Sequence, residues 1–195
     1  AGPLQRRGLA EIRRAPVTAP GTSRRAAIVE TARLLFNERG ATAVTTNHIA
    51  TAAGISPGNL YYHFRNKEEI IREHFAAISD GFDRLWQGLT EQPGNLAALR
   101  LRFAQTLDLY SAYRYFYIDL GPLLAADPDL AALYRENRRR HLAEQKRSIV
   151  ALVKAGILRG LDEVAADRLV TNGWLIAEYW LPFCAADPEA AGPDP

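Results

Sequence analysis

The sequence contains almost no sulfur. Its 195 residues include a single cysteine, Cys184, and no methionine. One cysteine excludes an internal disulfide and a multi-cysteine zinc site, so we expect Cys184 to fill space near the end of a helix. Methionine is missing even at position 1, which leaves a processed start, a tag-derived start and omitted modified residues as its explanations.

Long apolar runs and catalytic motifs are also missing. No run approaches the roughly 20 apolar residues that a membrane-spanning helix needs, and the N-terminus lacks the apolar core of a secretory signal. The sequence therefore predicts a soluble, cytoplasmic protein without a membrane partner. It has no HExxH pair, glycine-rich phosphate loop or Gly-x-Ser-x-Gly elbow, so we expect no catalytic residue, no metal and no cofactor. The four histidines are scattered over predicted helices: His48, His63, His74 and His141.

Charge is distributed unevenly along the chain. The formal net charge is only +2. Residues 1–75 carry a net charge of +5 and residues 76–195 a net charge of −3. A basic first part and an acidic second part are typical of a nucleic-acid-binding end joined to a part that avoids nucleic acid.

The segment from Thr45 to Lys67 predicts two short helices joined by a tight turn. Thr46 is the expected cap of the first helix, and Gly54 ends it in a left-handed conformation that glycine adopts without strain. Ser56 followed by Pro57 is a strong start signal for the second helix, because proline at the first helical position loses no backbone hydrogen bond. The pattern predicts a helix-turn-helix.

Most side chains of the second helix are polar or small, and only Leu60 and Phe64 are expected to be buried. In helix-turn-helix docking, the N-terminal part of the second helix meets base edges in the major groove, while hydroxyls and helix N-termini hold phosphates. For His63, packing inside the domain is an equally good interpretation. The predicted DNA-binding residues are Thr46, Ser56, Pro57, Gly58, Asn59, Tyr61, Tyr62, His63 and Lys67.

The segment from about Thr22 to Ile71 resembles the DNA-binding domain of the TetR family of bacterial transcriptional regulators. The resemblance covers three helices and rests on the ending Phe36 to Gly40, the IAxxAGIS core from Ile49 to Ser56, and LYYHF-x-x-K from Leu60 to Lys67. It implies a homodimer, a larger helical ligand-binding domain, and loss of operator binding when a small molecule enters.

The predicted organisation has four parts. Residues 1–21 form a flexible basic arm, residues 22–68 the helix-turn-helix DNA-binding domain, residues 69–186 a helical effector-binding and dimerisation domain, and residues 187–195 a tail. The fold class is all-α. Asn66 and Glu69 form a capping-box-like start of a helix that we expect to run to about Leu89.

Further helices are predicted over residues 96–117, 121–126, 128–154 and 162–185. Pro93 and Gly94 break the chain before the first, and Asp127 is the expected cap of the third. The last helix is apolar on two sides, so it needs two partners. One is its own core, and we expect the other to be the same helix of a second subunit, giving a homodimer through the C-terminal helices.

A ligand pocket in a helical bundle is mostly apolar with a few directing polar groups. For each aromatic residue below, simple core packing remains the competing interpretation, and Arg114 could instead pair with Asp108 or Asp119. The predicted lining residues are Trp86, Phe103, Leu107, Tyr110, Tyr113, Arg114, Tyr117, Tyr134, Arg138 and Trp174.

These features favour a homodimeric transcriptional regulator, a repressor that a small-molecule effector releases from a near-palindromic double-stranded DNA operator. The alternative is a DNA-binding architectural or regulatory protein without an effector, because an apolar bundle explains the second domain even without a cavity. A cavity, or a ligand-dependent shift in melting temperature, would separate the two.

Overall fold

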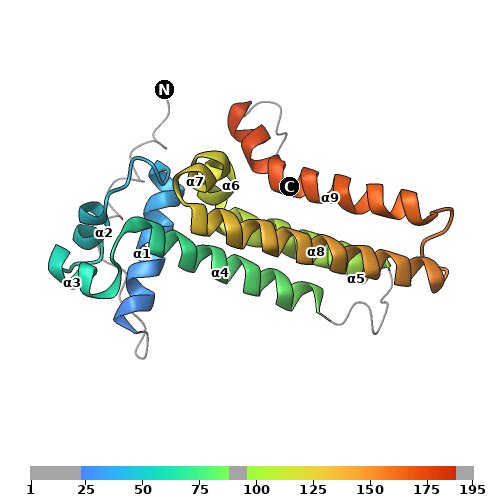
Figure 1. Ribbon diagram of the computed structural model, residues 1–195, viewed down its shortest axis with the longest axis horizontal. Helices are drawn as coiled ribbons and strands as arrows, with labels where there is room; N and C mark the ends of the chain where they lie inside the picture. Colours follow the sequence, from blue (N-terminus) through green and yellow to red (C-terminus); the bar gives the residue numbers. More distant parts are fainter. Residues whose placement is uncertain (1–22, 88–95, 188–195) are drawn as a thin grey trace, which may run out of the picture. The chain divides into compact units, whose positions relative to one another are not determined.

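The computed structural model describes residues 23–87 and 96–187, and within these ranges every regular element is a helix (Figure 1). The expected all-α fold class is confirmed. The chain divides into two compact units, residues 1–73 and 74–195. The expected basic arm, the end of a helix at Leu89, the break at Pro93 and Gly94, and the last eight residues of the tail lie outside the described residues.

The first unit contains three short helices and the start of a fourth. Helix α1 spans Arg24–Arg39, α2 spans Thr46–Ala52 and α3 spans Pro57–His63. Helix α2 contacts both α1 and α3. The core of this unit is formed by fully buried side chains from all three helices and the segments that follow them: Ile28, Ala32, Phe36, Val44, Ile49, Ala50, Leu60 and Phe64.

The turn between α2 and α3 forms as the sequence predicts. Gly54 adopts a φ of 65°, and Ile55 donates a backbone hydrogen bond of 3.0 Å to the Ala50 carbonyl. Ser56 then caps α3, because its hydroxyl accepts a 3.2 Å hydrogen bond from the Asn59 backbone, and Pro57 is the first helical residue.

Helix α4, Lys67–Trp86, contains the boundary between the two units. Its start matches the capping prediction, since Asn66 accepts a 2.9 Å hydrogen bond from the Glu69 backbone. In a complete capping box, the Glu69 carboxylate would accept a hydrogen bond from the Asn66 backbone N–H. It accepts instead from the backbone N–H of the preceding residue, Arg65, at 2.8 Å.

The second unit differs from the prediction at its first helix. Helix α5 spans Leu96–Ala112, and a separate short helix, α6, spans Arg114–Ile118. The expected single helix over 96–117 is therefore wrong. The α-helical hydrogen-bond pattern is interrupted at Tyr113, whose backbone N–H donates a 3.1 Å bond to the Tyr110 carbonyl, three residues back instead of four. The aromatic residues Tyr115, Phe116 and Tyr117 then lie buried within α6.

Three more helices complete this unit: α7 (Leu120–Ala126), α8 (Pro128–Lys154) and α9 (Glu163–Ala186). Asp127 caps α8 as predicted, through its carboxylate and two backbone N–H groups. Helix α9 contacts α5, α6 and α8, and Figure 1 shows it lying along α8. Within the described ranges, no helix is both long enough and apolar enough to cross a membrane.

Candidate nucleic-acid interface and internal cavity

The N-terminal half of α3 is anchored on one side and open on the other. Leu60 is fully buried and fixes the helix to the core of the first unit. Ser56, Pro57, Gly58 and Asn59 are all exposed. A Cβ atom added at Gly58 would meet no other atom within 4 Å, so this glycine is not needed for packing inside the unit. The surface around it is open to close approach by another molecule.

Two tyrosines extend this open face. Tyr61 is 51% exposed and Tyr62 is 84% exposed, a large aromatic area for a solvated helix. A 3.0 Å hydrogen bond joins the Tyr61 hydroxyl to the Thr46 hydroxyl, which lies on α2. The two helices therefore present these hydroxyl groups together, and the bond joins two of the predicted DNA-binding residues across α2 and α3.

Thr46 is not the cap of α2, and this expectation is corrected. Thr45 is the cap, because its hydroxyl accepts a 3.3 Å hydrogen bond from the His48 backbone. The His48 Nδ1 atom accepts a 3.3 Å bond from the Thr45 backbone in return. Two successive threonines made the choice ambiguous in the sequence, and the histidine three residues after Thr45 was the signal that could have decided it.

His63 is half-buried and packs edge-on against Tyr62 at 5.2 Å between ring centroids. Its backbone carbonyl accepts a 2.8 Å hydrogen bond from Arg25 of α1. The same guanidinium lies 4.0 Å above the Phe64 ring and forms an ion pair with Glu73. Arg25, which the sequence analysis did not single out, thus holds the C-terminal end of α3 in place.

Lys67 has internal partners that sequence reasoning missed. Its ammonium group donates to the Ala41 carbonyl at 2.6 Å and to the Val44 carbonyl at 3.0 Å. An ammonium group carries three N–H donors, so one remains for a phosphate. Lys67 therefore ties the segment between α1 and α2 to the start of α4, and its expected phosphate contact stays a prediction.

The second unit contains a mainly apolar cavity of about 170 Å³. Two residues of the predicted lining, Trp86 and Phe103, border it. The other eight do not line this cavity, and a role for them in ligand binding stays a prediction. The remaining lining residues, which sequence reasoning missed, come from α5, α8, the segment after α8, and α9: Leu99, Gln145, Ile149, Leu158, Leu169, Val170 and Gly173.

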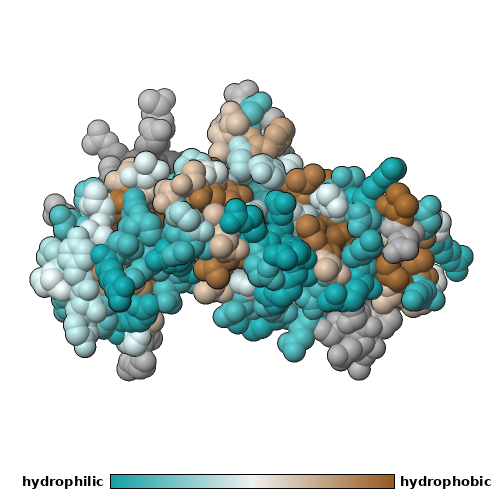
Figure 2. Space-filling model, in the orientation of Figure 1, coloured by the Kyte–Doolittle hydropathy of each residue, from teal (hydrophilic) through white to brown (hydrophobic). Residues whose placement is uncertain are grey.

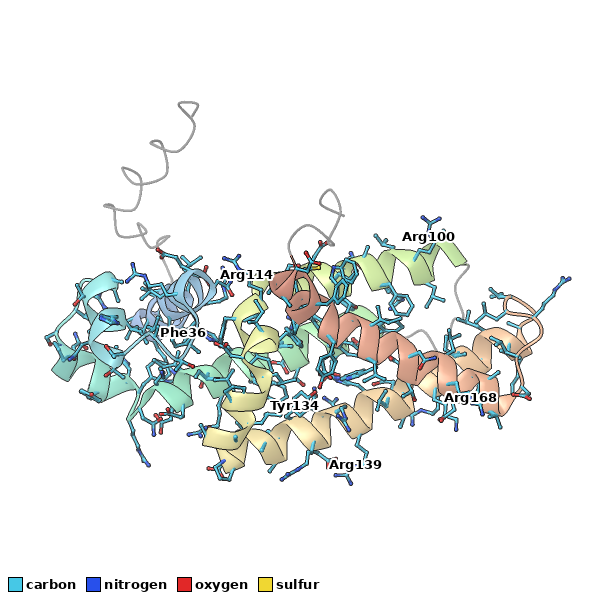
Figure 3. All side chains as sticks on the ribbon, turned by 90° about the horizontal axis from the view of Figure 1, so that it is seen from above. Phe36, Arg100, Arg114, Tyr134, Arg139 and Arg168 are labelled. Carbon is cyan, nitrogen blue, oxygen red and sulfur yellow. The ribbon has the colours of Figure 1, made fainter. Side chains whose placement is uncertain are left out.

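Several of the other predicted residues form a buried polar cluster around Glu178. The Glu178 carboxylate accepts hydrogen bonds from the Tyr134 hydroxyl and, at 3.2 Å, from the Trp174 indole. Figure 3 shows Tyr134 projecting from α8 toward α9. Burial raises the pKa of Glu178, although these two bonds and the charge of Arg138 act in the opposite direction.

The remaining predicted lining residues differ in exposure. Tyr110 and Tyr117 are buried and stacked, with ring centroids 4.2 Å apart. Burial raises the pKa of both phenols, so they are neutral at physiological pH. Leu107 is 37% exposed, Tyr113 is half-buried, and Arg114 and Arg138 are exposed.

A second buried polar group lies on α8. His141 is 1% exposed, its ring stacks on Phe82 at 4.2 Å, and its Nε2 lies 2.7 Å from the Asp83 carboxylate. Burial lowers the pKa of His141, although Asp83 raises it. Burial raises the pKa of Asp83, but hydrogen bonds from Arg140 and His141 outweigh this effect and leave it lowered. Neutral His141 therefore donates from Nε2 to an ionised Asp83.

One face of α9 is apolar and exposed. Ile176 is 66% exposed, Tyr179 55% and Phe183 54%. Together with Leu175 and Trp180 they line an open groove of about 520 Å³. Figure 2 shows brown, hydrophobic residues along the upper edge, where α9 lies. The opposite stripe of the helix, with Val170 and Trp174, is buried.

Both units match family models of bacterial regulators. Residues 28–74 match the model described as bacterial regulatory proteins, tetR family. Residues 71–194 match the model described as bacterial transcriptional repressor. The second match alone covers more than half of the chain.

Individual relatives agree with these matches. The chain is 30% identical over 167 residues to the HTH-type transcriptional repressor KstR2 of Mycobacterium tuberculosis, covering 81% of each chain. A TetR-family regulator from Marinobacter aquaeolei VT8 is 36% identical, with a TM-score of 0.80 over 85% of this chain and 82% of that one. AibR in complex with isovaleryl coenzyme A and operator DNA shares the fold, at 19% identity and a TM-score of 0.62 over 78% of this chain and 85% of its own.

Proposed function

This chain belongs to the TetR family of bacterial transcriptional regulators, and from that premise we propose that it is a repressor released from a near-palindromic operator by a small molecule. The observation that carries the DNA-binding part is the open face of α3. Its N-terminal residues and two tyrosines are exposed, while Leu60 and the Arg25 contacts keep the helix fixed.

In the proposed complex, α3 enters the major groove. Asn59 pairs with a base edge, and the slim backbone at Gly58 allows close approach. The hydroxyl pair of Thr46 and Tyr61 contacts phosphates beside it, and Tyr62 offers ring contacts. Ser56 and Pro57 place the N-terminus of α3, with its partial positive charge, toward the DNA backbone.

The proposed dimer forms through the exposed face of α9. Apolar side chains exposed on one helix mark a protein interface, because monomeric proteins rarely leave such faces in water. A twofold axis would place Ile176 and Tyr179 against the same residues of a second subunit, so that the contact is self-complementary. Two α3 helices related by this axis would meet two half-sites, which makes the operator an inverted repeat.

The proposed effector site is the cavity in the second unit. A mostly apolar cavity with a polar group is the usual form of a small-molecule site in a helical bundle. The structure of AibR with isovaleryl coenzyme A and operator DNA supports the proposal that this fold accommodates both kinds of ligand. Trp86 of α4 lines the cavity, so a ligand that moves α4 would change the spacing of the two recognition helices.

Selection of bound sequences from random duplex DNA tests this proposal. The purified protein is mixed with the duplex library at near-physiological salt, so that phosphate attraction alone does not dominate. We expect enrichment of an inverted repeat. Binding that depends on salt but enriches no sequence would contradict sequence-specific regulation and favour an architectural role.

A further inference from the structure

The cavity in the second unit is lined by no charged side chain from the described residues. Its walls are aromatic and aliphatic, and the indole N–H of Trp86 already donates a 3.1 Å hydrogen bond to the Thr106 hydroxyl. A carboxylate or ammonium group placed against these walls would lose part of its hydration without gaining a partner of opposite charge from the described lining. The lining therefore disfavours a charged ligand.

Gln145 is the exception to this apolar lining. It is 8% exposed and borders the cavity from α8. Its amide forms no hydrogen bond with another described residue. A glutamine amide carries both a hydrogen-bond donor and an acceptor. One ligand group that accepts or donates a hydrogen bond would satisfy it.

Gly173 is a second independent feature of the cavity. It lies inside α9, where glycine is less favourable than alanine because it loses more backbone freedom. A Cβ atom added there would meet no other atom within 4 Å. Gly173 lines the cavity, so the missing side chain leaves the space open.

Gly81 in α4 shows the contrast. A Cβ atom at Gly81 would lie 3.0 Å from a methyl group of Leu109, so close packing explains that glycine. Neither packing nor a positive φ explains Gly173. What sets Gly173 apart is that it borders the cavity and that the space at its Cβ position is open.

We propose that this cavity binds a compact, uncharged, mainly apolar molecule through one carbonyl or hydroxyl group held by Gln145. An apolar cavity of about 150 Å³ engineered into another protein takes up benzene, so a volume of about 170 Å³ suits one ring or a short branched chain with one polar substituent. This inference rests on the proposed effector site and gives it a chemical class.

Calorimetric titration of the full-length protein without DNA tests the assignment. Three probes of similar size test the two requirements of the assignment, one hydrogen-bonding group and no charge. Acetophenone has a carbonyl acceptor, ethylbenzene has none, and benzoate carries a charge. We expect acetophenone to bind about fivefold more tightly than ethylbenzene, because one ordinary hydrogen bond contributes about that factor to an affinity. Benzoate should give no measurable binding.

Two variants locate the binding. Gln145→Leu keeps the volume and removes the amide, so the preference for acetophenone over ethylbenzene should disappear while ethylbenzene still binds. Gln105→Leu, at an exposed position on α5, is the matched control and should keep the preference. Gly173→Leu should fill the cavity and abolish binding of both neutral probes without lowering the melting temperature.

The assignment is overturned if benzoate binds as tightly as acetophenone, if the preference survives in Gln145→Leu, or if no probe binds the native protein. It is also overturned if Gly173→Leu binds the probes unchanged, or changes the subunit number instead. Because these titrations contain no DNA, a chain that enriches an operator but takes up no probe contradicts this assignment alone. A chain that takes up acetophenone but enriches no operator sequence contradicts only the proposed regulatory function.

Discussion

At the residue scale, the side chains around α3 differ in whether they already have partners in the chain. The Asn59 side chain is exposed, and only its backbone N–H takes part in the cap of the helix. The Tyr61 hydroxyl is bonded to Thr46, and the Lys67 ammonium is bonded to two carbonyls. Substitutions at these positions should therefore separate effects on DNA binding from effects on stability.

Replacing Asn59 by alanine should relax sequence preference without destabilising the protein. Loss of a bidentate contact to a base costs about 1–3 kcal/mol of discrimination, or about 5- to 150-fold in affinity ratio. Competition binding between an enriched duplex and single-base variants measures this ratio. A ratio identical to that of the native protein would remove Asn59 from the recognition face.

Replacing Lys67 by methionine should lower stability as well as DNA affinity. The substitution keeps the aliphatic stem but removes two charge-assisted hydrogen bonds, which contribute about 1–3 kcal/mol to the free energy of unfolding. Urea unfolding measures the loss. Arg65→Met is the control, because the Arg65 side chain is 91% exposed. It should leave stability unchanged, and equal stability of both variants would refute the structural role of Lys67.

Glu178 should make stability depend on pH. Its pKa is raised in the folded state, so above the ordinary carboxyl value of 4.5 the folded chain binds more protons than the unfolded chain. The free energy of unfolding should then fall as the pH rises from that value through the raised pKa, by about 1.4 kcal/mol for each unit of pKa difference.

Glu178→Gln removes this titrating group and should flatten that part of the curve. Urea unfolding of both proteins between pH 4 and pH 8 measures the difference. Parallel curves for the variant and the native protein would show that Glu178 titrates with an ordinary pKa.

At the element scale, several start and turn signals that act within a few residues were predictable from the sequence, although the cap of α2 was not. Ser56 and Pro57 begin α3, and Asp127 caps α8. Gly54 makes the turn before α3 with a positive φ. Each signal depends only on the backbone of residues next to it. The break at Tyr113 was not predictable in this way. The short helix that follows it, α6, contacts α9, and packing against a segment so distant in the sequence leaves no local signal.

The exposed face of α9 gives a prediction for assembly. Ile176→Glu places a charge at the centre of the proposed interface, where a second copy of the same charge would face it, so the dimer should dissociate to monomers. Sedimentation measures the mass. Leu101→Glu, at a 59% exposed position on α5, is the control and should stay dimeric. A dimeric Ile176→Glu protein would place the interface elsewhere.

At the scale of the whole molecule, family and fold were predictable, whereas the cavity was not. The motifs from Phe36 to Lys67 are contiguous, so the resemblance to TetR regulators followed from the sequence and is confirmed. The cavity lining comes from four helices and the segment after α8, and only Trp86 and Phe103 were expected there. No local signal marks Gln145 as a lining residue, because its burial depends on segments that are distant in the sequence.

The central claim is sequence-specific DNA binding by a homodimer, and one affinity ratio tests it most directly. The dissociation constant of the protein is measured for the enriched inverted repeat and for a scrambled duplex of the same composition, both at near-physiological salt. A sequence-specific regulator predicts tighter binding to the repeat by at least about 10³-fold. A ratio near one would contradict the claim.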